Sequence, residues 1–489
     1  MATWHYKFEM YKHLADTRAQ LYEEAKKIPK EIGMPEELLG NVGLSGTVSG
    51  NHGLLRKEVS EAIDSGSRKA IGGASLHQEV RGLVKSYYGD DYDAVTASTC
   101  EALLLISLDA LAAPPITGRG DCYRACYIAP YERHAHHQAG YGRPFPPKYK
   151  DLFADRGVTA GEYGQSGKRL HNLETVLVPL AGANYACHGI SYNPCTLMLG
   201  VDPKQSAERM AEEARKRELY VSAFSSLGYT FPGYGYADKD SDGVPVLQKS
   251  IAQLATKYNV PYIVDNAAGL PFNCTDIRKL GADLVLFSMD KSSGAPTCGL
   301  AIGTEEIMVP LAKALGVHGQ RFGNPTAYGK AAYVQMDPGK ESLLGLIATL
   351  KVLLEKGDDF RRNTDLWYDI VVDEFDRFDS GLKQGLVISK DHNSCGVEVN
   401  YENTWADGKM GIPIFSIEDM YSGTSLIQSG MQQMGIIPCI AYDGNIRMSP
   451  GLGTVDENGK LMEETTRYVI RALVKFVELL CRYAGVLEQ

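Results

Sequence analysis

Two stretches of the sequence indicate the fold most clearly: Tyr262-Ile-Val-Asp-Asn-Ala-Ala-Gly269 and Asp283-Leu-Val-Leu-Phe-Ser-Met-Asp-Lys291. Each is a short apolar run that ends in polar residues, a pattern typical of strands buried in a parallel sheet. The carboxyl ends of parallel strands line the ligand crevice of an α/β fold. Asp265 and Lys291 are therefore expected to reach one site from two strands.

The same alternation of short strands and helical periods continues on both sides of these stretches. We predict a doubly wound, mostly parallel α/β domain at 76–330. A helical N-terminal arm at 1–75 precedes it, and a smaller α+β C-terminal domain at 331–489 follows. The predicted strands of the large domain are 94–97, 175–179, 220–224, 261–264, 284–288 and 299–302, and its predicted helices are 101–113, 203–217, 246–258 and 305–315.

The composition is that of an acidic globular protein: 489 residues with a formal net charge of −10 and 44% hydrophobic content. This charge argues against nucleic-acid binding, which rests on clustered Lys and Arg. No apolar run is long enough for a membrane span, and the N-terminus lacks a secretory signal pattern. The ten cysteines are scattered singly, as expected for reduced thiols. We expect a cytoplasmic protein with a small-molecule partner, no nucleic acid and no membrane.

A carboxylate and an amine delivered to one site are what pyridoxal 5′-phosphate (PLP) requires. The carboxylate keeps the pyridine nitrogen protonated, so that the ring can act as an electron sink, and the amine forms an imine with the aldehyde. Taken singly, Asp265 could cap a helix and Lys291 could be a solvated loop lysine. Together, and with the Ser and Gly residues around the lysine, they favour PLP as the cofactor.

A second anchor for the cofactor is predicted at 95–103, where a strand breaks into small hydroxyl residues and opens a helix. Backbone N–H groups and the helix dipole at such an opening bind anions, so Ser98, Thr99 and Cys100 are expected to hold the phosphate. Ser288 is expected to add a further phosphate ligand. The alternative is a plain helix N-cap, and the two roles are compatible.

These motifs resemble the selenocysteine-synthase-like branch of the fold-type I PLP-dependent enzymes, which includes bacterial selenocysteine synthase and ammonia lyases of amino sugar acids. The resemblance implies the fold-type I transferase fold with a seven-stranded, mostly parallel sheet, PLP as cofactor, and a homodimer or larger homo-oligomer. It also assigns Ala267 to the cofactor site. The matching segments cover most of the chain and include 43–50, 96–102, 264–272, 287–296 and 339–341.

The chain departs from this family in three respects. Ser292-Ser-Gly-Ala-Pro296 replaces the family's Gly-rich stretch after the lysine, and 141–200 looks like an insertion rich in Tyr, Gly and Pro. The acidic composition also lacks the basic surface expected of a member that acts on tRNA. The resemblance therefore implies the fold and the cofactor but leaves the substrate open.

The resemblance assigns roles to two further side chains. His134 matches the position of a residue that stacks on the cofactor ring and can move protons near the substrate α-carbon. Arg447, in the run Arg447-Met-Ser-Pro450, matches an arginine whose guanidinium fork binds the substrate carboxylate. A surface salt bridge is the alternative for Arg447.

Two other interpretations of His134 stay open. Cys122, Cys126, His134 and His136 are the residue types of a metal site, although their spacing matches no standard zinc pattern, and no metal is predicted. The cluster could also be a set of surface histidines on a loop.

We predict a PLP-dependent lyase or transferase that acts on an amino acid or amino sugar acid, with elimination or β-replacement as the leading reaction. Aminotransfer, aldol cleavage and decarboxylation remain open, because all use the same electron sink and differ in which α-bond breaks. The non-enzyme alternative is a PLP-fold protein that binds a partner or a metal without catalysis. The presence of both Asp265 and Lys291 argues against that alternative.

Overall fold

The chain forms two compact units, one at 58–355 and one that combines 1–57 with 356–489. The boundaries expected from the sequence were 75/76 and 330/331. The computed structural model describes residues 4, 7–46, 54–112, 125–129, 190–194, 203–216, 218, 221–228, 238–273, 276–317, 336–378, 380–418, 425–442 and 444–488.

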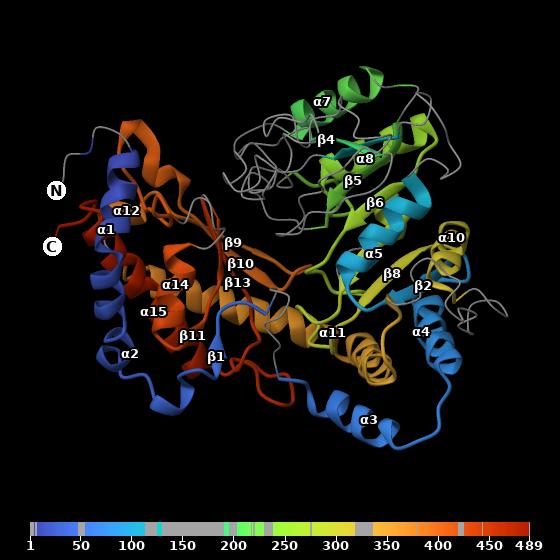
Figure 1. The fold of residues 1–489 in the computed structure, drawn as a ribbon, viewed down its shortest axis with the longest axis horizontal. Helices are drawn as coiled ribbons and strands as arrows, with labels where there is room; N and C mark the ends of the chain where they lie inside the picture. Colours follow the sequence, from blue (N-terminus) through green and yellow to red (C-terminus); the bar gives the residue numbers. More distant parts are fainter. Residues whose placement is uncertain are drawn as a thin grey trace, which may run out of the picture. The chain divides into compact units, whose positions relative to one another are not determined.

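The unit at 58–355 is built on a seven-stranded sheet with the order β2-β8-β7-β6-β5-β3-β4 (Figure 1). Neighbouring strands from β7 through β4 are parallel, whereas β8 runs antiparallel to both β2 and β7. The strands are β2 (Tyr92–Ala97), β3 (Ala125–Ala129), β4 (Ile190–Pro194), β5 (Val221–Leu227), β6 (Tyr262–Asp265), β7 (Leu284–Ser288) and β8 (Gly299–Thr304).

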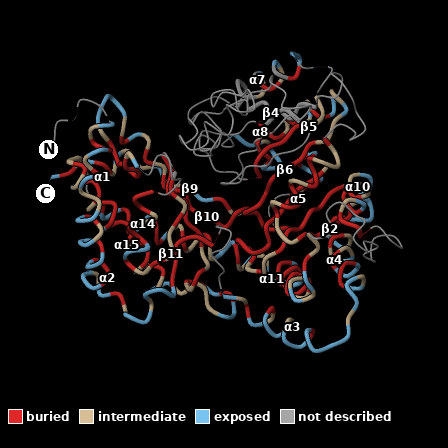
Figure 2. Tube along the Cα trace, in the orientation of Figure 1, coloured by how far each residue is buried: buried red, intermediate tan, exposed pale blue. Residues whose placement is uncertain are grey.

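Burial explains why these runs form strands. Every residue of β6 and β7 is buried, and so are five of the six residues of β2 (Figure 2). Strands covered on both faces can be apolar throughout, which is the pattern seen in the sequence. The predicted α/β class with a mostly parallel sheet is confirmed. The sequence missed β3 and β4, and the predicted strand at 175–179 lies outside the described residues.

The helices of this unit follow the predicted helical periods closely. α8 and α10 begin and end as predicted, and each stops at a residue in the left-handed conformation, Asn259 and Gly316. α5 is shorter than predicted because it changes into a π-helical turn, η2, after Ser107. The described helices are α3 (Lys57–Ser67), α4 (Gly73–Tyr88), α5 (Cys100–Ser107), η2 (Leu108–Ala112), α7 (Pro203–Lys216), α8 (Val246–Tyr258), α9 (Ile277–Leu280), α10 (Glu305–Leu315) and α11 (Lys340–Phe375), which has a non-helical residue at Lys356 and belongs to the second unit from that residue on.

The second unit combines the first helices of the chain with its last third. Its antiparallel sheet has the order β12-β13-β10-β9, and β1 pairs in parallel with β11. The elements are α1 (Lys7–Ala25), α2 (Ile28–Glu31), η1 (Glu36–Leu38), β1 (Val42–Gly43), α12 (Ser380–Lys383), β9 (Val387–Asp391), β10 (Gly396–Asn400), η6 (Glu402–Gly408), α14 (Leu426–Gln433), β11 (Ile436–Ile437), β12 (Ile440–Tyr442), β13 (Asn445–Met448) and α15 (Glu463–Tyr483).

The N-terminal helix is held to the C-terminal helix of the same unit. α1 packs along α15 (Figure 1), and Trp4 Nε1 donates a 2.7 Å hydrogen bond to the carbonyl oxygen of Ala484. Both helices contribute to one apolar core, in which Trp367 of α11 is the largest fully buried side chain. The N-terminal segment is thus part of a folded unit.

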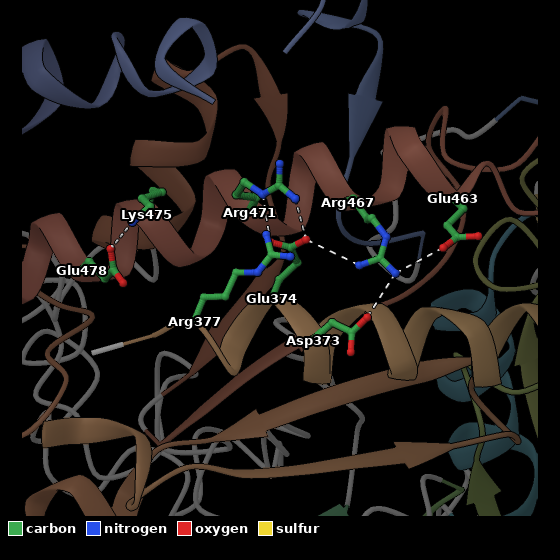
Figure 3. Close-up of polar contacts among 8 residues, drawn as sticks. All are labelled: Asp373, Glu374, Arg377, Glu463, Arg467, Arg471, Lys475 and Glu478. Atoms are coloured by element: carbon green, nitrogen blue, oxygen red, sulfur yellow. Dashed lines mark hydrogen bonds and ion pairs between the residues drawn. The ribbon is translucent and has the colours of Figure 1, made fainter. Parts of the chain in front are cut away.

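A buried carboxylate joins α11 to α15 in this unit (Figure 3). Glu374 is 1% exposed, and Arg471 donates two hydrogen bonds to it at 2.9 and 2.8 Å. Arg377 adds a bond of 3.2 Å, and Arg467 Nη1 lies 3.6 Å away. The hydrogen bonds that Arg471 donates to Glu374 raise the pKa of Arg471. The carboxylate of Glu374 is therefore the shared negative partner of three guanidinium groups, those of Arg377, Arg467 and Arg471.

Glu374→Ala is expected to lower the free energy of unfolding of this unit by about 3 kcal/mol, because it leaves clustered guanidinium groups without their buried partner. Asp373→Ala is the matched control. Asp373 is 57% exposed and contacts Arg467 at 3.1 Å, so its loss should cost under about 1 kcal/mol. Urea unfolding followed by circular dichroism measures both values. Equal losses in the two variants would contradict the role given to Glu374.

Candidate active site

Three polar turns meet at one edge of the seven-stranded sheet. β2 and β7 both run antiparallel to β8, so these two strands point the same way, and β6 is parallel to β7. Gly299, the first residue of β8, pairs with both Ala97 and Ser288, the last residues of β2 and β7. β6 ends beside them at Asp265. The residues that follow these strands therefore face one region, as the sequence predicted for Asp265 and Lys291.

Asp265 is a buried carboxylate with one oxygen engaged. Its Oδ1 accepts a 3.0 Å hydrogen bond from the backbone N–H of Ala267 and a long, 3.9 Å one from the thiol of Cys100. Among the described residues, none donates a hydrogen bond to Oδ2. Burial raises the pKa of Asp265 to about 6, against the opposing attraction of the Lys291 ammonium. The side chain thus has an open acceptor in a place where its charge is poorly solvated.

Two hydrogen bonds hold the turn that carries Lys291 against the loop after β6. Ser288 N donates to the carbonyl oxygen of Ala267 at 3.1 Å, and Ser292 Oγ donates to that of Ala268 at 2.6 Å. Lys291 is 6% exposed. Its positive charge lowers the pKa of both Asp265 and Cys100, although burial outweighs this effect in each case. An amine and a carboxylate are therefore buried close to each other.

Ser288 has a partner that the sequence did not reveal. Its hydroxyl donates a 2.7 Å hydrogen bond to Oδ1 of Asp290, which is 7% exposed. A serine hydroxyl has a single proton to donate. The predicted phosphate contact of Ser288 therefore stays a prediction, and it requires the hydroxyl to turn away from Asp290.

The turn between β2 and α5 has the form expected of an anion site. Thr99 is the N-cap of α5, and its hydroxyl accepts a 3.0 Å hydrogen bond from Ala102 N. The N–H groups of Cys100 and Glu101 occupy the first helical positions, which have no partner within a helix. The backbone of Thr99 lies close to that of Gly299, and only a glycine allows this, because a Cβ on residue 299 would lie 2.4 Å from the carbonyl oxygen of Thr99.

Cys100 and Glu101 both act on Asp265, which the prediction of a phosphate site did not include. The Cys100 side chain reaches Asp265, and burial raises the pKa of the thiol well above its usual value, so the sulfur keeps its proton and can donate it. Glu101 raises the pKa of both Asp265 and Cys100, which places a further negative charge near them. Sequence reasoning missed Glu101 and Asp290, although each adjoins a predicted site residue.

Arg447 lies in the other unit, on β13, where it is 3% exposed. Glu398 of β10 is its cross-strand partner and is 1% exposed. Directly opposed residues of an antiparallel pair lie on the same face of the sheet. A carboxylate thus shares the face of the arginine that was predicted to bind a substrate carboxylate. Nothing in a single run of sequence indicates this pairing.

Several predicted features fall outside the described residues. His134, Cys122 and His136 are among them, and of Cys126 only the backbone, in β3, is described. Within the described ranges, no group of three or more His, Cys, Asp or Glu side chains is placed to hold a metal ion. None of the helices in those ranges is long and apolar enough to cross a membrane.

Comparison with known proteins shows the fold. No family model and no curated protein matches the sequence. A SepCysS–SepCysE N-terminal domain complex matches at 13% identity over 93% of this chain and 99% of that one, with a TM-score of 0.52. A transaminase from the marine bacterium Virgibacillus matches at 11% identity over 90% and 89%, with a TM-score of 0.50. Pyridoxamine-pyruvate aminotransferase from Mesorhizobium loti matches at 12% identity over 92% and 94%, with a TM-score of 0.49. The architecture is that of the fold-type I PLP-dependent transferases.

Proposed function

We propose that this chain is a PLP-dependent enzyme that acts on a small amino substrate. The observation that carries the proposal is the burial of Asp265 and Lys291 at one edge of the parallel sheet, where the charge of the lysine acts on the carboxylate. A buried carboxylate whose pKa is raised to about 6 is costly unless it meets a cation. The protonated pyridine nitrogen of PLP is such a cation.

The residues present fit the three functional groups of PLP. Oδ2 of Asp265, which accepts no hydrogen bond among the described residues, would hold the pyridine N–H. The buried amine of Lys291 would hold the aldehyde carbon covalently. The first-turn N–H groups of α5, with the hydroxyls of Ser98 and Thr99, would hold the phosphate. Ala267 contributes by fixing Oδ1 of Asp265 through its backbone N–H.

When bound, PLP supplies an electron sink for the pair of electrons left by a broken bond at the substrate α-carbon. Asp265 would keep the pyridine nitrogen protonated. The amine of Lys291 would take the α-proton as a general base. We further assign His134 to stack on the cofactor ring and Arg447 to bind the substrate carboxylate.

Elimination or β-replacement on an amino acid or amino sugar acid is the reaction we propose first, on the strength of the sequence resemblance. Aminotransfer is the second candidate, and the likeness to a solved transaminase supports it. The two differ in their need for a second substrate. An elimination releases ammonia without an acceptor, whereas an aminotransfer requires a keto acid.

The purified protein incubated with PLP is expected to show a visible absorption band that hydroxylamine removes and fresh PLP restores. Mixing this holoenzyme with a panel of amino acids and amino sugar acids should then perturb the band for the true substrate class. Ammonia release with and without added keto acid separates elimination from aminotransfer. Absence of the band at saturating PLP would overturn the proposal and leave a binding protein as the remaining interpretation.

A further inference from the structure

A buried histidine lies behind the proposed phosphate-binding turn, outside the groups used so far. His77, on α4, is 4% exposed, and its Nδ1 lies 3.2 Å from Oγ1 of Thr96, which is itself buried on β2. Its Nε2 lies 3.1 Å from Oδ1 of Asp337, within ion-pair distance but outside hydrogen-bond geometry. The ring thus connects a strand residue to the segment just before α11.

With one backbone hydrogen bond, these contacts form a closed circuit of interactions around the turn, made by His77, Thr96, Ser98, Met336 and Asp337. Ser98, two residues after Thr96, donates its backbone N–H to the carbonyl oxygen of Met336 at 2.6 Å. Met336 is the neighbour of Asp337. The chain from Thr96 to Ser98 is therefore fixed at both ends, by the histidine ring at Thr96 and by the 336–337 backbone at Ser98. The next residue, Thr99, begins the anion site.

Both ring nitrogens have a polar group beside them. A ring that carries its proton on Nε2 would direct it toward the carboxylate of Asp337 and leave Nδ1 to accept the hydroxyl proton of Thr96. An apolar residue could fill the same space between α4 and β2. Burying the two ring nitrogens of a histidine costs free energy unless polar groups lie beside them. The contacts of His77 with Thr96 and Asp337 therefore call for an explanation.

We propose that His77 is a positioning residue for the cofactor phosphate and acts through Thr96 and Asp337. This inference rests on the proposed function. The circuit holds the backbone of Ser98 so that the N–H groups that follow it face the phosphate. Loosening the circuit should weaken the binding of a phosphorylated ligand while leaving the contacts to the ring of the ligand unchanged.

The chain contains a matched control on the same two elements. Arg81, one turn further along α4, forms an ion pair with the buried carboxylate of Asp93 near the start of β2, with a 2.7 Å bond from Nε to Oδ1. This pair also fastens α4 to β2. It lies at the opposite end of the strand from the turn, so its disturbance tests packing alone.

The test compares PLP with pyridoxal, which lacks the phosphate, by fluorescence titration of the cofactor-free protein. Thr96→Val replaces the hydroxyl with a methyl group of similar size, and it should lower the preference for PLP over pyridoxal roughly threefold to tenfold, the size of one lost hydrogen bond. Asp337→Ala should act in the same direction, and Asp337→Asn, which keeps an acceptor oxygen, should restore much of the preference. Arg81→Lys should lower the melting temperature without changing the preference.

An unchanged preference in both Thr96→Val and Asp337→Ala would overturn the inference while leaving the proposed function in place. The same drop in Arg81→Lys would also overturn it, because the effect would then belong to packing. A wild-type protein that binds PLP no better than pyridoxal would instead overturn the phosphate site on which the inference rests. His77→Ala adds a supporting measurement if its melting curve shows a folded protein.

Discussion

Lys291→Ala is expected to lower turnover by at least the roughly 10²–10⁴-fold typical of a lost general base, while the protein still folds and still binds PLP. The variant loses both the covalent anchor and the group that takes the α-proton. Asp265 and the turn at Ser98 to Cys100 remain, so noncovalent binding should persist. Steady-state kinetics with the substrate found by screening, together with equilibrium dialysis of PLP, measures the two properties separately.

Chemical labelling sharpens this prediction. Borohydride reduction of the wild-type holoenzyme, followed by peptide mapping, should place the pyridoxyl group on Lys291. Lys340→Ala is the matched control, because its ammonium donates to the backbone carbonyls of Ser67 and Lys69 at 3.0 and 2.5 Å and has no part in the site. That variant should keep both label and activity. Finding the label on another lysine would falsify the assignment of Lys291 and the mechanism built on it.

Asp265→Asn is expected to have the second largest effect, with opposite consequences for function and stability. The amide cannot keep the pyridine nitrogen protonated, so cofactor affinity and turnover should both fall steeply. In the cofactor-free protein, the same substitution removes a buried charge whose Oδ2 accepts no hydrogen bond from the described residues and whose burial outweighs the attraction of Lys291. The variant should therefore be more stable than the wild type near neutral pH.

The pH dependence of this gain follows from the pKa of Asp265. Burial raises that pKa from 3.8 to about 6, so between these two pH values the folded protein keeps a proton that the unfolded chain has released. Wild-type stability therefore falls as the pH rises through this window and stays lower above it. The stability difference between Asp265→Asn and the cofactor-free wild type should grow between pH 4 and 6 and level off at roughly 2–3 kcal/mol.

Urea unfolding of the two cofactor-free proteins at several pH values measures this difference. Added PLP should reverse the order of stability, because it binds the folded wild type and its protonated pyridine nitrogen would interact with the Asp265 carboxylate. A difference that stays constant from pH 4 to 8 would mean that Asp265 is not the group that titrates. A variant that still binds PLP as tightly as the wild type would remove Asp265 from the cofactor site.

Local patterns were sufficient to predict the framework of the site. The apolar runs at β6 and β7 and the polar residues that end them identified two buried strands and their functional edge. The helical periods of α8 and α10 gave their observed bounds. These features depend on residues close together in the chain, so burial and periodicity can be recognised directly in the local sequence.

Contacts between distant segments were beyond the reach of sequence reasoning. The sequence placed Cys100 among phosphate ligands, yet its thiol reaches Asp265, because that contact depends on how β2 and β6 lie in the sheet. Glu398 opposite Arg447 follows from strand register, and His77 beside Thr96 follows from the packing of α4 on β2. Each of these residues is present in the sequence, but nothing nearby in the chain identifies its partner, which lies far away in the sequence.

The division of the chain between its two units has a consequence for synthesis. Residues 58–355 form one uninterrupted unit, which can begin to fold on the ribosome as soon as it has emerged. α1 and β1 precede this unit in the chain, whereas their partners, α15 and β11, follow it, so α1 and β1 are made well before their partners. A nascent chain that stops before α15 therefore leaves the apolar face of α1 without the helix that it packs on, and this face stays uncovered until α15 has been made.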